Sequence, residues 1–91
     1  MCIPPSCKLA ATRHFVKRYF ERGIYSLIRN DELECRVSQA FSEGEIEVDE
    51  RHRGVEGPRY RVLLDLQGGR VMVICEKTGR CFKLITAWRI D

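Results

Sequence analysis

The spacing of hydrophobic residues changes near Gly44, from a period close to 3.6 residues to a period of two. The first period is typical of helices that bury one side, and the second of strands that bury one face. We therefore expect helices from Lys8 to Arg22 and from Asp31 to Ser42, followed by strands. Residues 1–7, which contain two prolines, are expected to form an irregular arm before a single domain of residues 8–91.

The first helix is expected to bury one apolar stripe and to stop at Gly23, because glycine often follows the last turn of a helix. The stripe consists of Leu9, Val16 and Phe20, with Thr12 and Tyr19 at its edge. The link from Ile24 to Ile28 is ambiguous and fits a short helical turn.

The second helix has an acidic first turn, which suits the positive end of a helix dipole. Asn30 or Asp31 can cap its start, and Gly44 is the expected stop. Its apolar stripe is formed by Leu33, Val37, Ala40 and Phe41.

Four strands are expected after Gly44. The segment from Glu45 to Asp49 alternates between acidic and apolar residues, and the stretch from Arg51 to Pro58 is expected to be a loop. Three longer strands follow at Arg59–Gln67, Arg70–Glu76 and Arg80–Ile90. The predicted fold class is α+β, with two N-terminal helices packed on a four-stranded, mainly antiparallel sheet.

Two short turns predict the register of the long strands. Gly68-Gly69 is expected to be a two-residue turn, and Lys77 to Gly79 a three-residue loop. The resulting cross-strand pairs are Leu64 with Val73, Val62 with Cys75, Cys75 with Cys81, and Ile74 with Phe82.

Alternation along the strands assigns their side chains to two faces. The face expected beneath the helices carries Tyr60, Val62, Leu64, Leu66, Val71, Val73, Cys75, Cys81, Ile85 and Ala87. The opposite face carries Arg59, Arg61, Leu63, Asp65, Met72, Ile74, Phe82, Leu84, Thr86 and Trp88. This second face is too apolar for one that only meets water, and such patches often mark a ligand surface. Arginines beside aromatic residues are typical of single-stranded RNA binding, whereas the alternative is that the arm or part of the helical half covers this face.

The charge of the chain adds to this expectation only through its clustering. The 91 residues carry a formal net charge of +3. Basic residues gather in two segments, one with Arg13, His14, Lys17, Arg18 and Arg22, the other with Arg51, His52, Arg53, Arg59 and Arg61. Such clusters favour polyanions, although a solvated surface has the same composition. We see no secretory signal and no apolar run of roughly 20 residues, and we expect a cytoplasmic protein without membrane contact.

The five cysteines do not suggest a metal site or a complete disulfide framework. Their number is odd and no C-x-x-C spacing occurs. Cys2 and Cys7 supply at most two thiolates, too few for a tetrahedral zinc site. We expect buried, reduced thiols and no metal or cofactor, and a reduced pair rather than a disulfide at Cys75 and Cys81.

Proton transfer and phosphate binding have candidate residues on the first helix. His14, Arg18 and Arg22 follow one another at intervals of four, which places them on one ridge, opposite the stripe of Val16 and Phe20. Histidine suits proton transfer near neutral pH and arginine suits phosphate. His52 is a second candidate for the proton-transfer role. No nucleotide-hydrolase, zinc-protease or serine-hydrolase motif is present.

Several short motifs together resemble a known family. They are His14, Arg18 and Arg22-Gly23-Ile24 in the first helix, Ser42-Glu43-Gly44 after the second, Tyr60-Arg61-Val62, and Ile85-Thr86-Ala87-Trp88 in the last strand. This pattern, from about Thr12 to Arg89, resembles an uncharacterised family of small prokaryotic proteins that looks related to RelE- and BrnT-type toxins. Their shared architecture also includes barnase and colicin nuclease domains.

The resemblance implies a RelE-like fold and a toxin-like, metal-independent endoribonuclease that acts on cellular RNA and is neutralised by an antitoxin-like protein. The family's recurrent positions correspond to His14, Arg18, Arg22, Arg61 and Thr86, which are the expected catalytic residues. From the basic cluster and the apolar face we expect RNA contacts at Lys17, Arg59, Phe82 and Trp88.

Two other functions remain open. A non-catalytic module that binds RNA or a protein through the same face is favoured by the scarcity of histidine and by the lack of a clear acid–base pair. A metal-binding accessory protein is disfavoured by the spacing of the cysteines.

Overall fold

The computed structural model describes residues 10–48, 58–78 and 81–90. The elements are β1 (Ala10–Ala11), α1 (Arg13–Glu21), the 3-10 turn η1 (Ile24–Ser26), α2 (Asn30–Glu43), β2 (Glu47–Val48), β3 (Arg59–Leu66), β4 (Gly69–Thr78) and β5 (Cys81–Ile90). The expected arm, the loop with His52, and the cysteines Cys2 and Cys7 lie outside the described residues.

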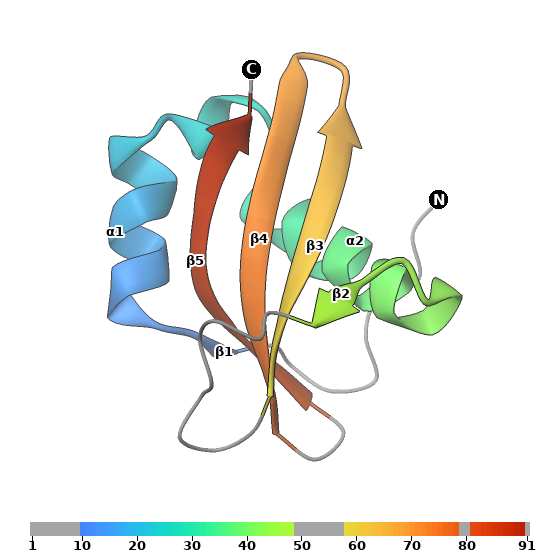
Figure 1. The fold of residues 1–91 in the computed structure, drawn as a ribbon. Helices are drawn as coiled ribbons and strands as arrows, with labels where there is room; N and C mark the ends of the chain where they lie inside the picture. Colours follow the sequence, from blue (N-terminus) through green and yellow to red (C-terminus); the bar gives the residue numbers. More distant parts are fainter. Residues whose placement is uncertain (1–9, 49–57, 79–80, 91) are drawn as a thin grey trace.

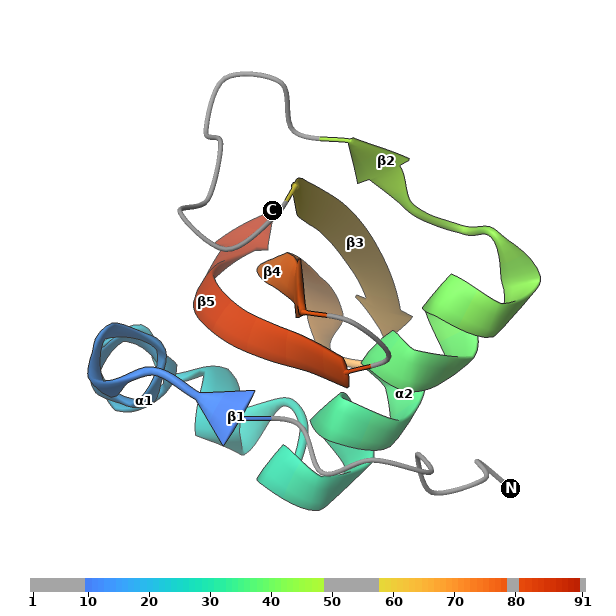
Figure 2. The same cartoon turned by 90° about the horizontal axis from the view of Figure 1, so that it is seen from below.

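The strands form one sheet in the order β1-β5-β4-β3-β2. Strands β2 to β5 are antiparallel, and β1 pairs in parallel with β5 through Ala10 and Lys83. Both helices lie on the same side of the sheet, with α1 along β5 and α2 behind β3 and β4 (Figures 1 and 2). The predicted α+β class, two helices on an antiparallel sheet, is confirmed, and β1 is an additional strand.

One hydrophobic core lies between the helices and the sheet. The sheet contributes Val62, Leu64, Val71, Val73, Cys75, Leu84 and Ala87, and the helical half contributes Phe15, Tyr19, Ile24, Ile28, Leu33, Val37 and Ala40. The expected stripe of α2 is therefore confirmed for Leu33, Val37 and Ala40, while Phe41 is partly buried against the core. Helix α2 ends at Glu43 and is followed by the cap residue Gly44, whose φ of 73° suits glycine.

The buried side of α1 differs from the predicted one. The helix begins at Arg13 rather than Lys8, and the Oγ1 of Thr12 caps it by accepting a 3.1 Å hydrogen bond from the Phe15 amide. Phe15 and Tyr19 face the core, whereas Val16 and Phe20 are 44% and 59% exposed. Two apolar pairs with the same i, i+4 spacing compete on this helix, and the Tyr19 hydroxyl finds a buried acceptor in the Ile28 carbonyl at 2.6 Å. The prediction that Val16 and Phe20 are buried is wrong.

The register of the β3–β4 hairpin differs by two residues from the predicted one. Leu66 pairs with Gly69, so the turn is Gln67-Gly68, and Leu64 pairs with Val71. A shift of two preserves the alternation, because side chains repeat every two residues. The predicted faces of β3 and β4 are therefore correct, although the predicted partners are not.

A β-bulge changes the faces of β5. Ile74 pairs with Thr86, but the next residue, Cys75, pairs with Leu84, and Thr78 pairs with Cys81. Bulges insert one extra residue and shift the alternation of one strand. Leu84 and Phe82 therefore turn toward the helices, contrary to prediction, and Cys75 is not opposite Cys81.

Candidate functional site

Helix α1 is fixed to the outer edge of β5 at both of its ends. The Thr12 hydroxyl donates to the Ile85 carbonyl at 3.1 Å, and Arg22 Nη1 donates to the Ala87 carbonyl at 2.8 Å. Carbonyls of alternate residues point to the same side of a strand, so both contacts cap one edge. Arg22, expected to act in catalysis, thus holds the sheet edge.

The ridge of His14, Arg18 and Arg22 lies beside the buried face of α1, not opposite it. At about 100° per residue, Arg22 is about 20° and Arg18 about 60° from Phe15 around the helix. Arg18 forms a 2.9 Å ion pair with Glu21, and its Nε is buried without a hydrogen-bond partner. His14 and Arg22 are exposed and Arg18 is half-buried, so His14 faces solvent as predicted.

The sheet face turned away from the helices brings several expected residues together. We call it the outer face and define it by Arg59, Arg61, Leu63, Asp65, Arg70, Met72, Ile74, Glu76, Thr86 and Trp88. Cross-strand pairing arranges them in rows, one with Arg61, Ile74 and Thr86, the next with Leu63, Met72 and Trp88. Arg59, Arg61, Thr86 and Trp88 are therefore on one face, as the alternation predicted.

Carboxylates orient two of the three arginines of the outer face. Arg61 Nη2 lies 3.1 Å from Glu47 Oε2 of β2, and Arg59 Nε lies 3.4 Å from Glu76 Oε2. Glu76 is buried, which holds its carboxylate at a constant place on the sheet. A guanidinium has five N–H donors, so one carboxylate contact does not use them all.

The apolar row of the outer face is open to solvent at its two ends. Leu63 is 47% and Trp88 36% exposed, and Met72 lies half-buried between them. The exposed Trp88 indole, on the same face as Arg61, offers a flat surface on which a base can stack.

Phe82 does not belong to this surface. Its ring stacks on Phe41 of α2 with a centroid distance of 3.7 Å, on the helix side of the sheet. The β-bulge that reverses this part of β5 is the reason.

An acid–base pair for catalysis is not visible in the described ranges. No hydrogen bond or ion pair between histidine and a carboxylate occurs there, nor a group of three side chains able to hold a metal ion. Burial raises the pKa of Tyr19, with a smaller contribution from Asp31, and raises the pKa of Cys75 to about 12. Both groups lie in the core, away from the outer face.

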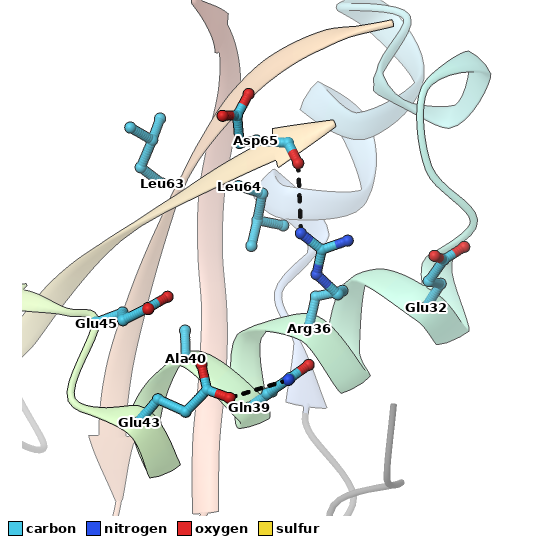
Figure 3. A pocket seen from close by; sticks show the side chains of 9 residues that line it. All are labelled: Glu32, Arg36, Gln39, Ala40, Glu43, Glu45, Leu63, Leu64 and Asp65. Atoms are coloured by element: carbon cyan, nitrogen blue, oxygen red, sulfur yellow. Dashed lines mark hydrogen bonds between the residues drawn. The ribbon is translucent and has the colours of Figure 1, made fainter. Parts of the chain in front are cut away.

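A groove that the sequence did not indicate lies between α2 and β3 (Figure 3). It has a volume of about 470 Å³. Its lining consists of Glu32, Arg36, Gln39, Ala40, Glu43, Glu45, Leu63, Leu64 and Asp65. The acidic spacing along α2 was visible in the sequence, but its position beside a strand edge depends on the packing of the helix.

The cysteines differ from expectation at one position. Cys35 of α2 is disulfide-bonded, and its partner is outside the described side chains, whereas Cys75 is free and buried. The prediction of reduced thiols is therefore wrong for Cys35. Disulfides persist mainly in oxidising compartments, so this bond does not favour the expected cytoplasmic location.

Comparisons with family models, with curated proteins and with solved structures found no match. Within the described ranges, neither helix has the length and apolar character needed to cross a bilayer.

Proposed function

We propose that this chain binds single-stranded RNA on the outer face of its sheet. The observation that carries the proposal is the pair of adjacent rows, Leu63–Met72–Trp88 and Arg61–Ile74–Thr86. Trp88 supplies a surface for base stacking, and Arg61 and Arg59 supply donors for phosphates.

Binding is tested with fluorescently labelled single-stranded RNA, by anisotropy at low salt and in EDTA. Trp88→Ala is expected to weaken binding by about tenfold or more, because stacking is worth about 1–3 kcal/mol per base. Phe20→Ala is the matched control, since it removes an aromatic ring that is also exposed but lies on α1.

The contribution of charge is tested by Arg61→Ala against Arg29→Ala. Both arginines form ion pairs with a carboxylate near the surface, but Arg29 is at the start of α2, away from the outer face. We expect weaker binding and a shallower salt dependence for Arg61→Ala alone. Equal affinities of wild type, Trp88→Ala and Arg61→Ala would contradict the proposal.

The second candidate function is cleavage of the bound RNA by a RelE-like, toxin-type endoribonuclease that an antitoxin-like protein neutralises. Two observations favour it: Arg61 and Thr86 share a row, and His14, Arg18 and Arg22 share a ridge of α1. His14 would transfer the proton and Arg18 and Arg61 would bind the phosphate, while Arg22 holds the Ala87 carbonyl.

Cleavage is tested by incubating total cellular RNA with the protein in EDTA. Fragments from wild type that disappear with His14→Ala/Arg18→Ala would support the ribonuclease. RNA that is retarded on a gel but stays intact would support RNA binding without cleavage. The absence of both cleavage and retardation would contradict both functions.

A further inference from the structure

The two edges of the sheet are protected to different extents. At the β5 edge, β1 pairs with Lys83 and Leu84, and side chains of α1 cap the carbonyls of Ile85 and Ala87. At the β3 edge, the pairing found within the described ranges joins β2 to Tyr60 and Arg61. Unpaired strand edges are templates for the addition of another strand.

The backbone of β3 beyond Arg61 points its hydrogen-bonding groups into the groove. Leu66 and Gly69 flank a two-residue turn, so Leu66 and Leu64 pair with β4. The amides and carbonyls of Leu63 and Asp65 must then point outward. The Asp65 carbonyl confirms this direction, since it accepts a hydrogen bond from Arg36 of α2 at 3.4 Å.

This edge has few partners within the described ranges. Among the described residues, the outward backbone groups of Leu63 and Asp65 make one hydrogen bond, which the Asp65 carbonyl accepts from Arg36. The stretch from Leu63 to Leu66 is roughly 10 Å long at about 3.4 Å per residue, which is room for about four residues of an added strand. Figure 3 shows Leu64 pointing toward α2, while the side chains of Leu63 and Asp65 point to the other side of β3.

The charge of the groove selects the kind of segment that fits. On its α2 side the groove carries the carboxylates of Glu32, Glu43 and Glu45 against the single guanidinium of Arg36, whereas the Asp65 carboxylate lies on the other side of β3. These groove side chains are thus formally −2, whereas the whole chain is +3. A second copy that presented its own β3 edge would bring two acidic linings together and be repelled.

We infer that the groove between α2 and β3 binds a basic, extended segment of a partner protein, which adds to the sheet as a strand beside Leu63–Leu66. Main-chain hydrogen bonds to Leu63 and Asp65 supply the affinity. Alternate side chains of the added strand point toward α2, and lysine or arginine at those positions meets the groove carboxylates. Arg36 competes with the added strand, because an incoming amide must replace the Arg36 guanidinium as the donor to the Asp65 carbonyl.

The inference is tested with a six-residue peptide that alternates valine and lysine, and with a valine–glutamate peptide as the charge control. Amide hydrogen exchange of the labelled protein is followed by NMR. The lysine peptide is expected to protect the amides of Leu63 and Asp65 by about tenfold, and to leave Leu64, already paired with β4, unchanged. Equal protection by both peptides, or protection at another strand, would overturn the inference.

Substitutions at the edge distinguish the contribution of main-chain hydrogen bonds to peptide binding from that of charge. Leu63→Pro removes one outward donor at a position where an edge strand tolerates proline, and Leu63→Ala is its control. We expect peptide binding to weaken about tenfold with proline and about twofold or less with alanine. Arg36→Gln is expected to strengthen binding about threefold, whereas Arg29→Gln, with the same change of charge outside the groove, has a smaller effect. Weaker peptide binding by Arg36→Gln would contradict the proposed competition between Arg36 and the peptide.

This inference does not rest on RNA binding. Trp88→Ala, which should impair RNA binding, is expected to leave peptide binding within about twofold. Protection of Leu63 and Asp65 by RNA but not by the lysine peptide would replace the protein partner with a nucleic acid. Self-association that is lost with Leu63→Pro would make a second copy the occupant, and so overturn the inference.

Discussion

Tyr19 shows how a single hydroxyl group decides which side of α1 is buried. By hydropathy alone, Val16 and Phe20 would compete well with Phe15 and Tyr19 for the core. The Tyr19 hydroxyl, however, donates a 2.6 Å hydrogen bond to the Ile28 carbonyl. A buried polar group without a partner costs about 1–3 kcal/mol, so this bond makes the burial of Tyr19 possible.

Tyr19→Phe is expected to lower the free energy of unfolding at pH 7 by about 1–2 kcal/mol, because it leaves the Ile28 carbonyl buried and unpaired. Burial raises the pKa of Tyr19 above its ordinary value of 10.0, so the unfolded chain loses this proton first as the pH rises. The stabilising contribution of the bound proton is complete below pH 10 and is lost above it. Urea denaturation on both sides of pH 10 should show a smaller alkaline loss in Tyr19→Phe than in the exposed control Tyr25→Phe.

Cys75 is expected to resist alkylation in the folded protein. Its side chain is fully buried, and burial raises the pKa of its thiol from 9.0 to about 12. The thiolate is the reactive form, so iodoacetamide at pH 8 should modify Cys75 only after the chain unfolds. Peptide mapping by mass spectrometry with and without urea measures this, and rapid labelling without urea would contradict the burial of Cys75.

At the scale of elements, α1 serves the sheet as an edge cover. Thr12 is the most connected residue of this arrangement, because it caps the helix and ties it to Ile85. Thr12→Ala is expected to cost about 1–2 kcal/mol of stability, and Thr12→Ser much less because it keeps the hydroxyl. Urea denaturation compares the three proteins, and an equal loss in both variants would assign the effect to the methyl group instead.

At the scale of the whole molecule, a disulfide at Cys35 links α2 to a part of the chain outside the described side chains. A disulfide stabilises mainly by restricting the unfolded chain, typically by about 2–4 kcal/mol. A phosphine reductant should therefore lower the stability of the wild type and leave Cys35→Ser, already less stable, unchanged. Urea denaturation with and without reductant tests this, with Cys75→Ala as the control that keeps the response. An unchanged stability of the wild type in reductant would contradict a disulfide at Cys35.

Most of the residues of the outer face could be predicted from the sequence, but Phe82 was wrongly included. Arg59, Arg61, Thr86 and Trp88 were assigned to it by alternation, which survives an even register shift, of two for β3 and of four for this part of β5. Phe82 was misplaced because a bulge depends on how β5 fits between β4 and the helices. The acidic groove was missed because α2 and β3 are distant in sequence, and only their packing places Glu32, Arg36 and Glu43 beside an open edge.

The sequence by itself determined the helices, the long strands and the α+β class, because hydrophobic periods, caps and glycine stops act locally. Only the tertiary structure decided which stripe of α1 is buried, where the bulge reverses β5, and how Cys35 is used. Within the described residues, it also decided that β2 pairs with Tyr60 and Arg61 of β3 and not with the stretch that follows them. These outcomes depend on contacts between distant segments, where local patterns with similar free energies are resolved by a single hydrogen bond or packing fit.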